Sequence, residues 1–131
     1  MKTSLRLLAL ALFALLVSLE ASAASSLSGT WSGSGVAVPT DGAKEKVSCR
    51  ISYGPQSGKL VGVNVKCTST SAKRIVQAGQ LRQIGENTYV GQFASAKHAV
   101  SGSVTVTVSG SVQTVTFSSN KGHASVTLKK L

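Results

Sequence analysis

Hydrophobic and polar residues alternate along most of the chain beyond residue 28. In the segment 47–53, Val, Cys, Ile and Tyr occupy one face, and Ser, Arg and Ser occupy the other. The segment 104–108 alternates strictly between Val and Thr. A period of two is the pattern of a β-strand that has one buried face. The pattern therefore predicts an all-β protein, with almost no signal for a helix.

Turn-forming residues divide this pattern at short intervals. Clusters rich in Gly, Pro, Asn, Asp and Ser, which favour tight turns, lie at residues 39–42, 54–58, 85–87, 109–110 and 120–122. The connections are too short to hold a crossover helix, so neighbouring strands should be antiparallel. We predict eight strands, at residues 29–38, 45–53, 59–68, 73–83, 87–95, 99–108, 111–118 and 123–131.

An eight-stranded sheet with no helix to cover it must bury its apolar face against itself. The simplest solution is a single small up-and-down β-barrel, which also removes the exposed sheet edges. A two-sheet β-sandwich is the alternative. Gly residues inside strands suit the bends and bulges at the corners of a barrel, and this chain places them at Gly33, Gly35, Gly79, Gly91 and Gly102.

The first 23 residues have the pattern of a secretory signal peptide. Lys2 and Arg6 precede an apolar run at residues 7–19, and the small-x-small sequence at 21–23 predicts cleavage before Ala24. The apolar run is too short to span a membrane stably. We therefore expect a signal peptide at 1–23 and a barrel domain at 24–131, which is periplasmic or secreted and does not span a membrane.

Two cysteines, Cys49 and Cys67, remain after the signal peptide. In an oxidising compartment such a pair predicts a disulfide, worth roughly 3 kcal/mol by chain entropy. A hairpin centred on Gln56 would place Cys49 opposite Val63, so the bridge would need a longer loop, a bulge or a different pairing. Both His residues lie far from the cysteines in sequence, and we predict no metal site and no cofactor.

The net charge of the chain is strongly positive. It is +10 at pH 7, and removal of Lys2, Arg6 and Glu20 with the signal peptide leaves +9. Such a charge favours polyanions. Outside the cytoplasm these are an anionic envelope polymer, a lipid headgroup or an acidic partner, and not nucleic acid. The alternative is that the charge only keeps the surface soluble. The candidate anion-binding surface consists of Lys73, Arg74, Arg82, Lys97, Lys129 and Lys130.

The only Trp of the chain stands in the sequence Ser28-Gly29-Thr30-Trp31, at the start of the first predicted strand. This resembles the Gly-x-Trp opening of calycin barrels, which include the lipocalins, the avidins and the small bacterial metalloprotease inhibitors. The resemblance implies that Trp31 packs across the closed end of the barrel as a plug. Avidin-type ligand sites need further Trp residues, so biotin binding is not implied. The inhibitors carry a short N-terminal arm, which would be residues 24–27 here.

The other aromatic residues of the predicted strands have two interpretations. They either fill the core or form the wall of a small apolar pocket. The candidate pocket residues are Tyr53, Tyr89, Phe93 and Phe117.

Catalysis is not expected. His98 and His123 have no acidic neighbour in sequence, and no Gly-x-Ser-x-Gly motif is present. We therefore expect a monomeric, non-enzymatic binding protein of the cell envelope. Its ligand is either a small apolar molecule in the barrel or an anionic envelope component on the basic surface. The alternatives are a periplasmic inhibitor of a secreted hydrolase or protease, and an envelope-stability protein with no discrete ligand.

Overall fold

The computed structural model describes residues 27–97 and 99–131, so the predicted signal peptide lies outside the described residues. Eight strands follow one another without a helix in the part of the chain that is described, and each lies within two residues of its predicted bounds. They are β1 (Gly29–Pro39), β2 (Glu45–Tyr53), β3 (Leu60–Ser69), β4 (Arg74–Gly85), β5 (Thr88–Ser95), β6 (Val100–Ser109), β7 (Val112–Ser119) and β8 (Gly122–Lys130).

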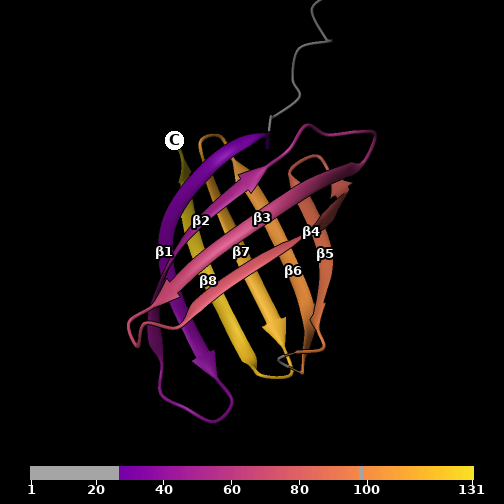
Figure 1. The fold of residues 1–131 in the computed structure, drawn as a ribbon. Helices are drawn as coiled ribbons and strands as arrows, with labels where there is room; N and C mark the ends of the chain where they lie inside the picture. The colour runs from indigo at the N-terminus through magenta and orange to yellow at the C-terminus, as the bar shows by residue number, and fades with distance from the viewer. Residues whose placement is uncertain (1–26, 98) are drawn as a thin grey trace, which may run out of the picture.

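The strands form a closed barrel in chain order (Figure 1). Every strand is antiparallel to its neighbours, and β1 pairs with both β2 and β8. This confirms the predicted up-and-down barrel and excludes the sandwich. The barrel has two ends. The Trp31 end holds residues 27–30, the C-terminus and the turns after β2, β4 and β6. The far end holds the turns after β1, β3, β5 and β7.

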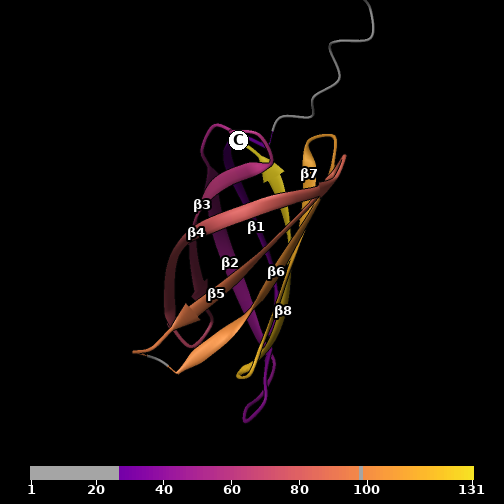
Figure 2. The same ribbon diagram turned by 90° about the vertical axis from the view of Figure 1, so that its right-hand side faces the viewer.

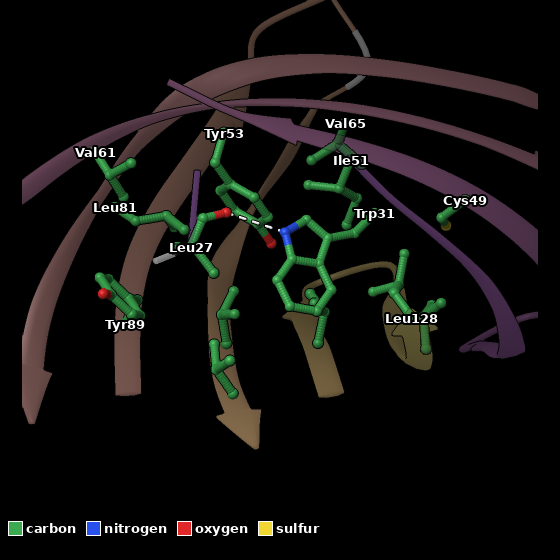
Figure 3. Packing of buried hydrophobic residues seen from close by; sticks show 14 of the residues in the cluster. Leu27, Trp31, Cys49, Ile51, Tyr53, Val61, Val65, Leu81, Tyr89 and Leu128 are labelled. Atoms are coloured by element: carbon green, nitrogen blue, oxygen red, sulfur yellow. Dashed lines mark hydrogen bonds between the residues drawn. The ribbon is translucent and has the colours of Figure 1, made fainter. Parts of the chain in front are cut away.

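The Trp31 end of the barrel is filled by large side chains. Trp31 is 0% exposed, and its Nε1–H donates a hydrogen bond to the Leu27 carbonyl oxygen at 3.0 Å. That bond holds buried Leu27 against the barrel, among the core residues of β2, β3 and β4 (Figure 3). Leu27 is therefore part of the core, and the N-terminal arm suggested by the inhibitor resemblance loses this residue.

Cys49 and Cys67 form the expected disulfide between β2 and β3. They lie directly opposite each other in the ladder, with their Cα atoms 4.1 Å apart. The prediction that Cys49 faces Val63 was wrong, because Val63 pairs with Tyr53. Gly58 and Lys59 form the two-residue turn between paired Ser57 and Leu60, and not Gln56 as the prediction had assumed. Gly58 has a φ of +62°. Three residues, 54–56, oppose two, 61–62, between the Ser57–Leu60 bridge and the Tyr53–Val63 pair. This one-residue shift in register places the two cysteines opposite each other.

Close approach of strands explains some of the glycines. A Cβ at Gly33 would lie 1.9 Å from the Thr127 carbonyl oxygen, so only glycine lets β1 pack this tightly on β8. Gly79 is different. It pairs regularly with Val63, and no atom lies within 4 Å of the position its Cβ would take. The regular pairing excludes a bulge at Gly79, and the side on which its Cβ would lie faces open space.

Candidate ligand-binding site

The barrel wall is least complete between β4 and β5. These strands pair only at Arg82–Val90, Gln83–Tyr89 and Gly85–Thr88. Residues 74–81 pair with β3 alone, and residues 91–95 pair with β6 alone. The two strands meet at the Trp31 end and diverge toward the far end (Figure 2). The strands are still in contact where Gly91 lies against Gln80 and Leu81, so we call the wedge between residues 74–79 and 92–95 the seam.

The inner wall beside the seam is accessible to solvent. Ile75 pairs with the disulfide residue Cys67 and shares its inward phase, yet the Ile75 side chain is 55% exposed. Leu81 has the same phase six residues later and is 1% exposed. Gly79 lies between them and faces the open space described above. The inner face of β4 therefore changes from filled to open along its length.

Aromatic side chains lie on the inward phase of the strands beyond the seam. Phe93 of β5 and Phe117 of β7 are half-buried, and their rings meet edge to face with centroids 6.5 Å apart. Val63, Val104 and Phe117 pack against the edge of the buried core. We call eight inward-phase residues beside the seam and the edge of the core the open half: Ala37, Val63, Ile75, Gln77, Gly79, Phe93, Val104 and Phe117. Further partly buried residues on the inward phase lie toward the far end, and they include Glu45, Ser69, Ser95, Val100 and Ser119.

The structure separates the four aromatic residues that the sequence grouped as a pocket. Phe93 and Phe117 belong to the open half, whereas Tyr53 and Tyr89 are buried in the filled half. Burial raises the pKa of the Tyr53 hydroxyl above its ordinary value, and a hydrogen bond to Gln113 opposes this in part. Burial also raises the pKa of Tyr89, whose hydroxyl donates to Gln56 Oε1 at 3.2 Å.

Gln113 is a functional candidate that the sequence analysis missed. It is 1% exposed, and its Oε1 accepts a hydrogen bond from the Tyr53 hydroxyl at 2.5 Å. Its Nε2 has no hydrogen-bond partner among the described residues. The sequence does contain a signal for this residue. Gln113 is a polar residue on the same strand phase as Val115 and Phe117, where an apolar residue is expected.

The six basic residues predicted as one anion-binding surface divide between separate places. Lys73 and Arg74 precede and begin β4, and Lys97 follows β5, so these three lie at the far end where the seam is widest. Arg82 projects outward from the paired part of β4. Lys129 and Lys130 end β8 at the Trp31 end, where Lys130 Nζ lies 5.7 Å from the centroid of the Trp31 ring.

Among residues 27–97 and 99–131, no group of three or more His, Cys, Asp and Glu side chains is placed to hold a metal ion. His98 lies outside the described residues. No helix in the described part of the chain is long and apolar enough to cross a membrane.

Comparison with known proteins shows the fold. No family model and no curated protein matches the chain. A redesigned β-barrel, b11L5F_LGL, superposes with a TM-score of 0.63 at 18% identity, over 83% of this chain and 95% of that one. The redesigned barrel mFAP1, bound to DFHBI, gives 0.64 at 16% identity, over 79% and 94%. Rv2717c from M. tuberculosis gives 0.59 at 10% identity, over 82% and 94%. At such identities the likeness supports the eight-stranded barrel alone.

Proposed function

We propose that this chain is an exported, non-enzymatic binding protein that takes a small apolar ligand into the open half of its barrel. The observation that carries the proposal is the solvent-accessible inner wall, where Gly79 faces open space and Ile75 is 55% exposed on the inward phase. Covering apolar surface of this kind with an apolar ligand is favourable, because that surface leaves water.

The remainder of the barrel supplies a rigid floor for such a ligand. The open half borders a core that includes the fully buried side chains of Leu81, Val106 and Val115. Barrels of this size either fill their interior with side chains or hold one small ligand, and this barrel combines the two. A redesigned barrel of the same fold, mFAP1, is bound to DFHBI, which supports a binding role for this fold.

The chemistry of the open half favours binding over catalysis. Its eight residues carry one polar side chain, the amide of Gln77, and among the described strands a single carboxylate, that of Glu45, shares the inward phase nearby, with no imidazole and no free thiol. General acid–base or nucleophilic catalysis requires such groups at the reacting atoms. The single amide is suited to orient a polar atom of a ligand.

Export and calycin kinship remain part of this proposal. The Cys49–Cys67 disulfide supports an oxidising compartment. The buried position of Trp31 at one end of the barrel supports the calycin resemblance. Mass spectrometry of the protein recovered outside the cytoplasm tests export, since we expect a chain that begins at Ala24.

The binding proposal is tested by filling the open space without disturbing the wall. Gly79→Leu places a side chain where no atom lies within 4 Å. Gly62→Leu is the matched control, because Gly62 also has no atom within 4 Å but lies on the outward phase of β3. With the neutral dye N-phenyl-1-naphthylamine, we expect saturable binding to the unmodified protein and to Gly62→Leu. We expect about a tenfold or greater loss for Gly79→Leu, since several methylenes of contact are displaced. Equal binding by both variants would exclude the open half as the site.

A further inference from the structure

The wide end of the seam combines an apolar interior with a positively charged rim. Lys73 and Arg74 lie where the unpaired part of β4 begins, and Lys97 lies just beyond the unpaired part of β5. All three side chains are exposed. A neutral apolar ligand would make no use of these three charges, which stand at the mouth of the space that it would occupy.

We propose that the ligand is a single-chain amphiphile with an anionic headgroup. Its chain lies in the open half, and its headgroup remains at the far end between Lys73 and Arg74 on one side and Lys97 on the other. This inference rests on the proposed function and adds the chemical class of the ligand. This arrangement is favourable for such a molecule, because its charged headgroup stays in water and its apolar chain is removed from water.

Other charged groups also lie at this end, among them Lys121 in the turn after β7 and Lys46 at the start of β2. Asp41, Lys44 and Glu45 lie in and beside the turn after β1, along a shallow depression that they share with Lys73. The turn after β3 stands between them and the seam in the order of the strands. The carboxylates of Asp41 and Glu45 therefore lie beside Lys73, on the side away from Lys97 in the order of the strands, and they offset part of the Lys73 charge.

The dimensions of the seam suit a medium-length chain. Residues 74–79 of β4 pair only with β3, and at about 3.3 Å per residue a six-residue strand spans about 20 Å. An extended alkyl chain can lie along this length beside Ile75 and Gly79 and reach the Phe93–Phe117 pair. The filled half sets the inner limit, because Leu81 closes the wall.

The inference is tested with ligands that share a dodecyl chain and differ in charge. Displacement of N-phenyl-1-naphthylamine is measured for dodecanoate, dodecyl phosphate, dodecanol and dodecyltrimethylammonium, all below their micelle concentrations. We expect the two anions to bind most tightly and the cation most weakly, with the preference reduced at high ionic strength. The stronger of the two anions indicates whether a carboxylate or a phosphate is the preferred headgroup.

Charge reversal locates the headgroup. We expect Lys73→Glu/Arg74→Glu to weaken dodecanoate binding about tenfold, because each exposed ion pair contributes a modest favourable free energy and the contributions of two pairs are lost together. We expect dodecanol binding to be unchanged, because dodecanol has no charge. Lys59→Glu/Lys129→Glu is the matched control, since it makes the same change in net charge with exposed side chains at the Trp31 end. We expect it to leave dodecanoate affinity within about twofold of the original value.

The outcomes separate this inference from the proposed function. Equal affinity for dodecanoate and dodecanol, or equal losses in the two charge-reversal variants, would overturn the anionic amphiphile while leaving an apolar ligand in place. Failure of every dodecyl compound to displace the dye, together with unchanged dye binding by Gly79→Leu, would overturn the proposed function itself.

Discussion

The buried pair formed by Tyr53 and Gln113 provides a quantitative test of how the filled half is stabilised. The Tyr53 hydroxyl donates to Gln113 Oε1 at 2.5 Å, both side chains are buried, and Gln113 Nε2 has no partner among the described residues. Tyr53→Phe removes the one hydrogen bond and leaves the Gln113 amide without any partner. Leaving a buried polar group unsatisfied costs about 1–3 kcal/mol, so we expect the free energy of unfolding to fall by about 2 kcal/mol.

The double variant should behave differently from either single change. Gln113→Met alone removes the unpartnered amide but leaves the Tyr53 hydroxyl orphaned, so the two effects oppose each other. Tyr53→Phe combined with Gln113→Met replaces both partners by apolar groups of similar shape, which is nearly neutral or stabilising. We therefore expect the loss in the double variant to be about 1–3 kcal/mol smaller than the sum of the two single losses.

Urea unfolding is a suitable assay, because Trp31 is the only Trp and is fully buried in the folded state. Its fluorescence should be blue-shifted before unfolding and should move to the red in one transition. An unfolding free energy of Tyr53→Phe equal to that of the unmodified protein would refute the reasoning, since the Gln113 amide would then have another hydrogen-bond partner. Additive losses in the double variant would refute it equally.

Three further predictions concern the rest of the barrel. The raised pKa of Tyr53 means that ionisation of its hydroxyl favours the unfolded chain. The contribution of Tyr53 to stability is therefore complete below about pH 10 and is lost as the pH rises above that value. We expect the unfolding free energy of Tyr53→Phe to fall less steeply between about pH 8 and about pH 11 than that of the unmodified protein, and equal slopes would contradict a raised pKa for Tyr53. Replacing both cysteines by Ala opens a bridge between residues 18 apart and should cost roughly 3 kcal/mol in urea unfolding, whereas a loss below about 1 kcal/mol would show that the bridge contributes little. Gly33→Ala would place a Cβ 1.9 Å from the Thr127 carbonyl oxygen and should cost about 3 kcal/mol, whereas Gly62→Ala, with nothing within 4 Å, should cost far less; similar melting temperatures would contradict the close packing of β1 on β8.

The strands could be predicted from sequence because burial of one sheet face forces a period of two, and because Gly, Pro and Asn positions limit the turns. The register of β2 and β3 could not be predicted, since it depends both on a turn at Gly58 and Lys59 and on one extra residue at 54–56 opposite 61–62. The disulfide residues were therefore correct, while their alignment was not.

The candidate site was harder to predict than the fold. Phe93 and Tyr89 share one face of β5, yet one lies in the open half and the other in the filled half, because the seam opens between them. Local patterns indicate which face is inward, but they do not show how far two strands diverge. The same reason explains Gly79, whose open surroundings result from missing neighbours on β5 and not from its own conformation.

Two-dimensional NMR of the labelled protein during titration with dodecanol tests the central claim most directly. We expect the largest shifts at the backbone amides of residues 75–79, Phe93 and Phe117, with small shifts at Trp31 and at the outward-facing Gly62. Shifts that gather at the Trp31 end or over the outer face, or no saturable shifts at all, would contradict a ligand site in the open half.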